Sequence, residues 1–313
     1  MTTFRPLDIT TDAAEMARLY SYAAPEPISA QTARDWWTPR EGETRVTMLA
    51  LDESAHPIGY WDVERETWMK PGRFFIKVIV APEARGQGLG AQMYADALRL
   101  SRQHGATHLE SMVRAEDDRS VRFAKQRGFQ VERHMFESSL DLAEFDERPY
   151  CDLLSRLEVQ GFRFFSLADA GLTDENKHRL YDVNRSASLD DPGSTGTFPD
   201  FYAFSKNVFE ASWFRADTQP LAAQADHWVG LAAIGIYPDD RHAYNAFTGV
   251  LREYRGRGLA QALKLQTILL AKREGMRYIR THNDSNNAPM LAINRKLGYK
   301  PESGVYRLLC ALE

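Results

Sequence analysis

The residues best suited to do chemistry in this sequence form a glycine-rich turn within 250–260, which reads Val-Leu-Arg-Glu-Tyr-Arg-Gly-Arg-Gly-Leu-Ala. Gly256 and Gly258 allow the backbone to approach a ligand closely. An apolar run precedes the turn and a helical pattern follows it, so the start of a helix would present unpaired N–H groups and the positive end of its dipole there. Arg255 and Arg257 add positive charge. These features predict an anion site of the kind that binds phosphate groups.

The same turn occurs earlier in the chain, at 80–90, as Val-Ala-Pro-Glu-Ala-Arg-Gly-Gln-Gly-Leu-Gly. The offset that places Arg85 on Arg255 also places Gly128–Phe129 on Gly298–Tyr299, with no insertion between them. Chance does not keep one register over so long a stretch in two places. We therefore infer an internal duplication in which each half carries its own phosphate turn.

The elements that must position these turns follow from hydrophobic periodicity. Each turn is expected between an apolar strand and a helix within a mixed sheet, which predicts an α/β fold. In the first half we expect strands at 4–9, 44–51, 57–66, 74–80, 107–113 and 129–140, and helices at 12–22, 30–37, 89–103 and 120–127. In the second half we expect strands at 162–167, 221–225, 228–236, 243–250, 277–283 and 305–309, and helices at 173–187, 200–211, 259–272 and 289–297. A stretch rich in Gly, Pro and Asp at 190–199 predicts a long loop, where sites and lids are often carried.

Length and composition limit the classes of function. The 313 residues suffice for two domains, which we place at 1–143 and 161–313, with the charged, proline-containing segment 144–160 as the linker. With 39 basic and 43 acidic residues the net charge is −4, which gives no indication of a nucleic-acid or membrane surface. We see no apolar run of membrane-spanning length and no signal-peptide core, so we expect a cytoplasmic protein.

Both halves resemble the GNAT superfamily of N-acetyltransferases. Its signature turn is Arg or Gln, two residues, Gly, one residue, and Gly or Ala, and both turns match it. The resemblance implies two tandem GNAT-like domains, as in mycothiol synthases, each a mixed, mostly antiparallel sheet flanked by helices. It also implies that the turn binds the pyrophosphate of acetyl-CoA. The expected cofactor-binding residues are Val80, Arg85, Gly86, Gln87, Gly88, Leu89 and Gly90 in the first half, and Val250, Arg255, Gly256, Arg257, Gly258, Leu259, Ala260 and Asn287 in the second.

A second family motif indicates which half is catalytic. The family has an Asn, a small or apolar residue, a Tyr and Gly-Phe at set spacings. The second half has Asn287, Met290 and Gly298–Tyr299 at these positions, but Asn294 stands in place of the Tyr. The first half has Asp117 in place of the motif Asn and lacks the Tyr as well. The resemblance therefore implies a catalytic C-terminal domain and a degenerate N-terminal one.

The resemblance implies direct attack of an amine on the acetyl-CoA thioester in a ternary complex. An amine with a pKa of about 10 is mostly protonated at neutral pH, so it needs a base. The strand before the second turn has no Asp or Glu. The candidate bases are His242 and Tyr244 at the start of that strand and Asp226 and His227 at a strand turn, with His242 as the first choice. A backbone N–H near Val250 would meet the developing oxyanion, and Asn294 could hydrogen-bond the sulfur.

Other phosphate-binding classes fit these residues less well. Neither turn has the Gly-Lys-Ser/Thr of a P-loop NTPase. Neither combines three glycines with the acidic residue that follows them in dinucleotide-binding folds. No His/Cys cluster has the spacing of a metal site, so we expect no metal.

The function that the resemblance implies is acetylation of an amine on a small molecule or peptide, without nucleic-acid or membrane partners. Because the motif Tyr is missing from both halves, a non-catalytic protein that binds acyl-CoA or serves as a scaffold is the alternative. A third possibility is that both halves are active. The sequence does not identify the acceptor, and we expect a monomer or a homodimer.

Overall fold

The computed structural model describes residues 2–24, 27–38, 41–67, 69–194 and 196–312. The chain forms two compact units: unit 1 comprises Met1–His134 with Val305–Glu313, and unit 2 comprises Met135–Gly304. The change from unit 1 to unit 2 therefore falls inside a strand. The segment 144–160, where we expected a linker, contains the helix Leu153–Val159, whose Leu153 and Leu157 are buried in the core of unit 2.

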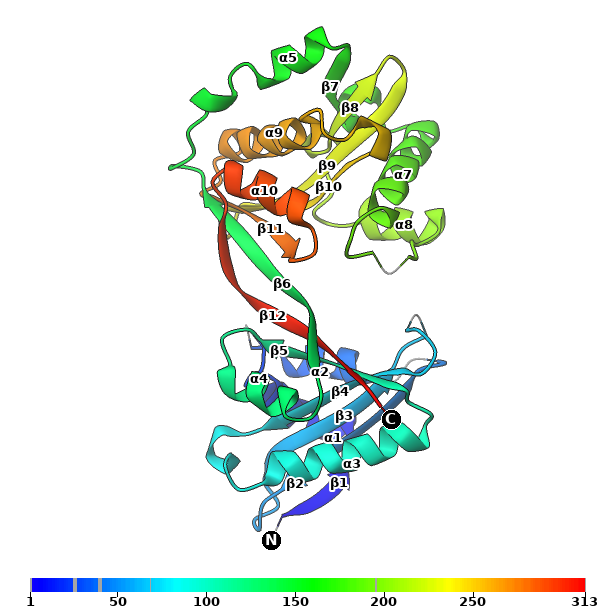
Figure 1. The fold of residues 1–313 in the computed structure, drawn as a ribbon, viewed down its shortest axis with the longest axis vertical. Coiled ribbons are helices and arrows are strands. Elements are labelled where there is room, and N and C mark those ends of the chain that lie inside the picture. Colours follow the sequence, from blue (N-terminus) through cyan, green and yellow to red (C-terminus); the bar gives the residue numbers. More distant parts are fainter. Residues whose placement is uncertain (1, 25–26, 39–40, 68, 195, 313) are drawn as a thin grey trace. The chain divides into compact units, whose positions relative to one another are not determined.

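Unit 1 is a mixed sheet with helices packed against it (Figure 1). Its elements are β1 (Thr3–Pro6), α1 (Ile9–Tyr20), α2 (Ala30–Trp37), β2 (Thr44–Leu51), β3 (Pro57–Arg65), β4 (Arg73–Val80), η1 (Pro82–Ala84), α3 (Leu89–Gln103), β5 (His108–Arg114), α4 (Asp118–Lys125) and parts of β6 (Gln130–Asp141) and β12 (Lys300–Ala311). The strand order is β1-β2-β3-β4-β5-β12-β6. The pair β4–β5 is parallel, whereas β1–β2, β2–β3, β3–β4 and β5–β12 are antiparallel.

Unit 2 repeats this plan. Its elements are η2 (Arg148–Tyr150), α5 (Leu153–Val159), β7 (Phe162–Ser166), α6 (Leu167–Ala170), α7 (Asp174–Leu189), α8 (Phe201–Val208), η3 (Ala216–Thr218), β8 (Pro220–Gln224), β9 (His227–Tyr237), β10 (His242–Val250), η4 (Arg252–Tyr254), α9 (Leu259–Arg273), β11 (Tyr278–Asp284) and α10 (Ala288–Lys296). The strand order is β12-β6-β11-β10-β9-β8-β7. Only the β10–β11 pair is parallel among the described pairings of unit 2, so the expected mixed, mostly antiparallel sheet is confirmed.

Two long strands take part in both units. The second part of β6, from Met135, pairs with β11 in unit 2, although it precedes that unit's other elements in the sequence. The last part of β12, Val305–Ala311, returns to unit 1 and pairs with β5. We expected a short final strand at 305–309, but β12 spans Lys300–Ala311. Each unit is thus completed by a strand from the opposite half of the sequence.

Helices cover both faces of the unit 2 sheet, which creates two hydrophobic cores. Helix α9 packs on β8, β9 and β10, and its Leu263 and Ile268 belong to one buried cluster. Helices α7 and α8 form the other cluster with the opposite face (Figure 1). Gly249 permits close packing there, because a Cβ at this position would lie 2.6 Å from the Cβ of Ala187 in α7. The strand before the glycine turn is therefore held from both sides.

Local capping shifts some expected element boundaries. We expected the first strand to reach Ile9 and the first helix to start after Thr11, but β1 ends at Pro6 and α1 begins at Ile9. The Asp8 side chain accepts a hydrogen bond from the Thr10 N–H at 3.0 Å, which starts the helix earlier. In the expected loop at 190–199, Thr195 lies outside the described residues. No helix in the described ranges is long and apolar enough to cross a membrane.

Candidate active site

The glycine turn of unit 2 leaves several backbone donors without a partner. Gly256 and Gly258 have φ values of 78° and 96°, in the left-handed region that favours glycine. Gly258 is the N-cap of α9 and has no side chain to bond the first helical N–H groups. The N–H groups of residues 256–260 have no acceptor among the described residues. Together with the dipole of a 15-residue helix, they form an anion site.

Space above this turn is open. A Cβ built on Gly256 would meet nothing within 4 Å, and one on Gly258 would meet only Leu153 Cδ1, at 3.7 Å. Backbone conformation therefore explains the glycines at these two positions, and crowding by the protein does not. The open space and the free N–H groups fit a bulky phosphate-bearing ligand.

The arginine of each turn holds the turn against the end of its strand. Arg255 Nε donates to Val250 O at 2.8 Å, and in unit 1 Arg85 Nε donates to Val80 O at 2.9 Å. The repeated bond explains why an arginine begins both turns. Arg257 lies over the ring of Tyr254, with its guanidinium carbon 5.6 Å from the ring centroid.

The sheet of unit 2 divides in front of the turn. Strands β10 and β11 are paired from His242↔Tyr278 to Asn245↔Thr281, and no later pair is formed in the described strands, although β10 continues to Val250. At the point of division the Thr281 hydroxyl donates to Asn245 O at 3.1 Å. We call this point, at Asn245 and Thr281, the apex. Beyond it, in the described strands, β10 stays paired with β9 but not with β11, and this free side of the strand leads toward the anion site.

A β-bulge lies at this apex. The register between β10 and β9 shifts between Asn245 and Phe247, so Ala246 has no Cα partner in either described neighbour strand. Ala246 is exposed, whereas Asn245 is buried. A bulge leaves its extra residue unpaired and bends the strand. The bulge thus presents backbone polar groups at the opening between the strands.

The structure places His242 and Val250 at opposite ends of β10. His242 belongs to the paired end, where its ring stacks on Tyr237 with centroids 4.8 Å apart, and its Nδ1 lies 4.0 Å from Asp240 Oδ2. Val250 is buried next to the turn. The roles of His242 as a base and of Val250 as an oxyanion donor stay predictions. The residue of β10 without a Cα partner in the described neighbour strands is Ala246, at the apex, which sequence reasoning did not single out.

The second motif organises the helix that follows β11. Asn287 Oδ1 accepts from the Met290 N–H at 3.2 Å and so caps α10. Asn294 is 2% exposed and donates from Nδ2 to Asn283 Oδ1 at 2.6 Å. The Asn294 Oδ1 atom is buried without a hydrogen-bond partner in the described part of the chain. A role for Asn294 toward a sulfur stays a prediction, while its contact with Asn283 ties α10 to β11.

The loop after α7 bridges the two sides of the divided sheet. Asp190 pairs with Arg252, which follows β10, at 2.7 Å between Oδ1 and Nη2. Its Oδ2 atom lies 3.5 Å from Arg255 Nη2. Asp191 Oδ2 accepts from Asn287 Nδ2, after β11, at 2.7 Å. Hydrogen bonding from Arg252 lowers the pKa of Asp190, so the carboxylate beside the turn is charged.

A carboxylate from the first half of the sequence belongs to this site. Glu137 on β6 is the cross-strand partner of His282 on β11. Tyr244 is the partner of Arg280, and alternation places it on the same face of the sheet as His282 and Glu137. Burial and the charge of Glu137 raise the pKa of Tyr244. No hydrogen bond or ion pair holds the Glu137 carboxylate within the described ranges.

Sequence reasoning missed Glu137 because it considered candidate bases for the second unit only within the second half of the sequence. Glu137 lies in the first half of the sequence. It belongs to unit 2 only because the second part of β6 pairs with β11. A weak signal was available: the strand at 129–140 is longer than its neighbours, which is compatible with pairing in two places.

Unit 1 keeps the turn but differs at the apex. Gly86 and Gly88 have φ values of 85° and 83°, and the N–H groups of residues 86–90 lack acceptors in the part of the chain that is described. Strands β4 and β5 part after Phe75↔Glu110, and the Ser111 hydroxyl donates to Ile76 O at 2.9 Å. However, the described β3–β4 pairs show no shift in register. Unit 1 thus has the anion site without the bulge.

The acidic motif residue of unit 1 acts as a helix cap. Asp117 Oδ1 accepts from the Ser120 N–H at 3.0 Å, and its Oδ2 accepts from the Ser120 hydroxyl at 2.6 Å. Both carboxylate oxygens are therefore engaged at the start of α4.

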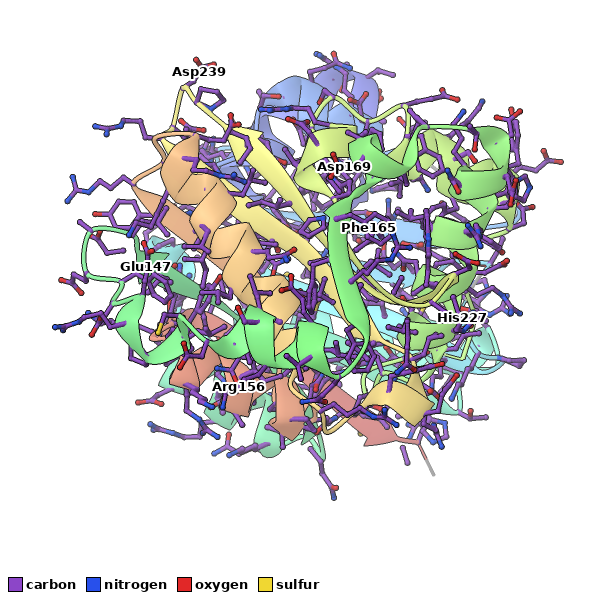
Figure 2. The ribbon with its side chains drawn as sticks, turned by 90° about the horizontal axis from the view of Figure 1, so that it is seen from above. Glu147, Arg156, Phe165, Asp169, His227 and Asp239 are labelled. Carbon is purple, nitrogen blue, oxygen red and sulfur yellow. The ribbon has the colours of Figure 1, made fainter. Side chains whose placement is uncertain are left out.

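A cavity of about 760 Å³ lies elsewhere in unit 2, between β7 and α9. Its lining includes Glu147, Phe165 and Asp169, and Figure 2 shows α9 passing between Glu147 and Phe165. None of its lining residues belongs to the glycine turn or to the apex. The volume of this cavity is therefore no reason to place the candidate active site in it. In the ranges that the structure describes, no group of three or more His, Cys, Asp or Glu side chains could hold a metal ion.

Comparison with known proteins gives the same two repeats. The profile of the acetyltransferase (GNAT) family matches residues 11–129 and 180–299. A mycothiol acetyltransferase from a Nocardioides species is 27% identical over 299 residues, which cover 88% of this chain and 92% of that protein.

Solved structures share the fold along the whole chain. A GCN5-related N-acetyltransferase from Sphaerobacter thermophilus has a TM-score of 0.68 at 19% identity, covering 99% of this chain and 95% of that one. A tandem GNAT protein from the clavulanic acid biosynthesis pathway has a TM-score of 0.66 at 18% identity, covering 99% and 98%. The chain belongs to the acetyltransferase (GNAT) family, as a tandem of two GNAT repeats, and is an acetyltransferase.

Proposed function

We propose that this chain transfers the acetyl group of acetyl-CoA to an amine on a small molecule or peptide, and that unit 2 carries the reaction. The observation that carries the proposal is the bulge at the apex of the divided sheet, directly ahead of a turn with unpaired N–H groups. Unit 1 has the turn but shows no such shift in its described β3–β4 pairs. The family uses acetyl-CoA, and the open anion site suits its pyrophosphate.

In this proposal the elements of unit 2 divide the binding of acetyl-CoA between them. The N–H groups of residues 256–260 and the dipole of α9 receive the pyrophosphate. The unpaired edge of β10 beyond Asn245 offers backbone groups to the amide-bearing arm, as a sheet edge does to an added strand. The thioester then reaches the apex, where the backbone of the bulge stabilises negative charge on the carbonyl oxygen.

Glu137 is the base in this proposal, in place of a residue on β10. The ammonium form of the acceptor loses one proton to the Glu137 carboxylate, directly or through His282. The neutral nitrogen then bonds to the thioester carbon, the C–S bond breaks, and a second proton leaves the nitrogen as the thiolate becomes a thiol. Tyr244 stays a neutral hydrogen-bond donor, since its pKa is raised. Direct attack requires both substrates to be bound together.

A small-molecule acceptor is favoured over a peptide. The relative from Nocardioides is named a mycothiol acetyltransferase, and its similarity extends over nearly the whole of both chains. We propose an amine on a polar small molecule, approaching the face that carries Glu137, His282 and Tyr244.

Thiol release tests the proposed function. The purified full chain is incubated with acetyl-CoA and a panel of amines that includes amino sugars, amino-sugar conjugates, amino acids and short peptides. Steady release of CoA thiol with at least one amine is the expected result. Binding of acetyl-CoA in calorimetry without release for any amine would instead favour the non-catalytic, binding-only alternative.

A further inference from the structure

A lysine is buried inside unit 2, next to the apex of the divided sheet. Lys264 lies in the second turn of α9 and is 1% exposed. Its Nζ is 2.6 Å from Oδ1 of Asn245, and it lies 5.0 Å from the centroid of the Tyr299 ring. A protonated amine has three N–H donors, and the described structure gives this one a single acceptor. Burial lowers the pKa of Lys264 to about 7.

Asn245, the partner of Lys264, holds both sides of the bulge. Its Nδ2 donates to Ala233 O on β9 at 3.0 Å and to Phe247 O, beyond the bulge, at 2.9 Å. Its Oδ1 accepts from Lys264 and, at 3.1 Å, from the Thr248 hydroxyl. The amide thus uses its two donors and two acceptor positions. Lys264 is the contact that connects this arrangement to α9.

Unit 1 provides an internal comparison. Tyr94 stands at the position of Lys264, and neither Phe75 nor Ile76, where β4 leaves β5, has a polar side chain. The described β3–β4 register is regular there. Strands β4 and β5 nevertheless separate, and the Ser111 hydroxyl donates to Ile76 O where they do so. The lysine–asparagine pair therefore accompanies the bulge, and it is not needed to divide the sheet.

Stability does not explain a lysine at this place. An amine without a carboxylate partner costs free energy when it is buried, and an apolar side chain of similar length would avoid that cost. The cost points to a role in holding the backbone.

We infer that Lys264 is a positioning residue for acetyl transfer, which acts through Asn245 to hold the β10 bulge and the backbone of Ala246 at the apex. The inference rests on the proposed function of unit 2. Lys264 is buried, so it acts without touching either substrate. The neutral form of the Lys264 amine suffices for this role, because one N–H is enough to bond Asn245 Oδ1.

Two substitutions of similar length test this inference in the full chain. Lys264→Gln keeps a neutral N–H donor for Asn245, while Lys264→Met removes the donor. With the most active amine of the panel, we expect kcat of the Gln variant to stay within about threefold of the wild type. We expect the Met variant to lose roughly 10- to 100-fold in kcat, with little change in KM for acetyl-CoA, because misplacement of reacting groups lowers the rate more than binding.

Equal kcat values for the two variants, whether high or low, would overturn the inference. Hydrogen exchange gives a readout that does not need turnover. In the Met variant, amides of 242–250 should exchange faster than in the Gln variant, while those of α3 in unit 1 stay unchanged. Equal exchange of 242–250 in both variants would also overturn it. This readout separates failure of the inference from failure of the proposed function, because it holds even where no amine is acetylated.

Discussion

Asp190 and Arg252 form a two-point ion pair beside the glycine turn of unit 2, at 2.7 Å and 3.1 Å. The next residue, Asp191, accepts from Asn287 across the divided sheet. Because Arg252 follows β10 and Asn287 follows β11, two consecutive carboxylates span both sides of the opening. The charge of Asp190 therefore neutralises cations that would otherwise face an incoming phosphate.

Asp190→Asn should strengthen the binding of acetyl-CoA. Removing one negative charge near the anion site leaves Arg252 and Arg255 free to attract the phosphates. Exposed ion pairs are weak and are screened by salt, so we expect a gain of only about three- to fivefold at low salt that disappears at high salt. Calorimetry at two salt concentrations measures the effect, with Asp174→Asn as the control on the exposed start of α7. Weaker binding by the Asp190 variant would mean that the bridge is needed to shape the site.

Glu137→Gln should remove most of the activity. Loss of a general base lowers rates by about 10²- to 10⁴-fold, and acetyl-CoA affinity should not change, because the anion site is intact. Steady-state kinetics across pH measures this. The matched control is Glu144→Gln, an exposed carboxylate after β6 that pairs with Lys300 at 2.9 Å. Wild-type activity in the Glu137 variant would assign the proton transfer to another group, with His242 as the first candidate.

Stability should depend on pH through Lys264. Its native pKa of about 7 lies below the ordinary value of 10.5, so between these values the unfolded chain binds more protons than the native one. The wild type therefore gains stability as pH rises through this window. Lys264→Gln should be more stable than the wild type at pH 7 and below, and its advantage should shrink by about 1.4 kcal/mol per pH unit above pH 7.

Urea unfolding of both proteins at several pH values from about 6 to 9 measures that difference. A stability difference that stays constant across this range would show that the Lys264 amine titrates normally.

The last part of β12 pairs with β5, so the stability of unit 1 should depend on the residues after Gly304. Truncation after Gly304 removes the strand between β5 and β6 of unit 1, including the buried Leu308 and Cys310. It also removes Arg307, whose Nε lies 3.1 Å from Glu110 Oε2. Loss of one buried Leu alone costs about 2–5 kcal/mol. Hydrogen exchange should show lost protection throughout unit 1 and retained protection in 145–300, whereas unchanged unit 1 amides would contradict the strand assignment.

The glycine turns were predictable because they are local. An apolar strand, glycines at positive φ and a helix start all fall within a few residues, and the second copy removed the ambiguity of the first. The mixed sheet followed from the same periodicity and from the family resemblance, and it is confirmed.

The apex and the proposed base were not predictable, because they depend on contacts between distant residues. In the sequence Lys264 is one polar residue of a largely apolar helix, and only packing places it against Asn245. Glu137 reads as a residue of the first repeat, since period-two alternation does not reveal which strand a long β6 will pair with. Both residues required the tertiary structure.

The proposal that unit 2 carries the reaction is tested most directly by one matched pair of substitutions. Gly88→Glu and Gly258→Glu each place a carboxylate against the expected phosphates at an N-cap of similar φ, 83° and 96°, so their costs to folding should be alike. Acetyl-CoA-dependent thiol release by the full chain is measured for both. We predict that Gly258→Glu abolishes turnover and that Gly88→Glu retains most of it. Retained turnover in Gly258→Glu with loss in Gly88→Glu would contradict the assignment of catalysis to unit 2.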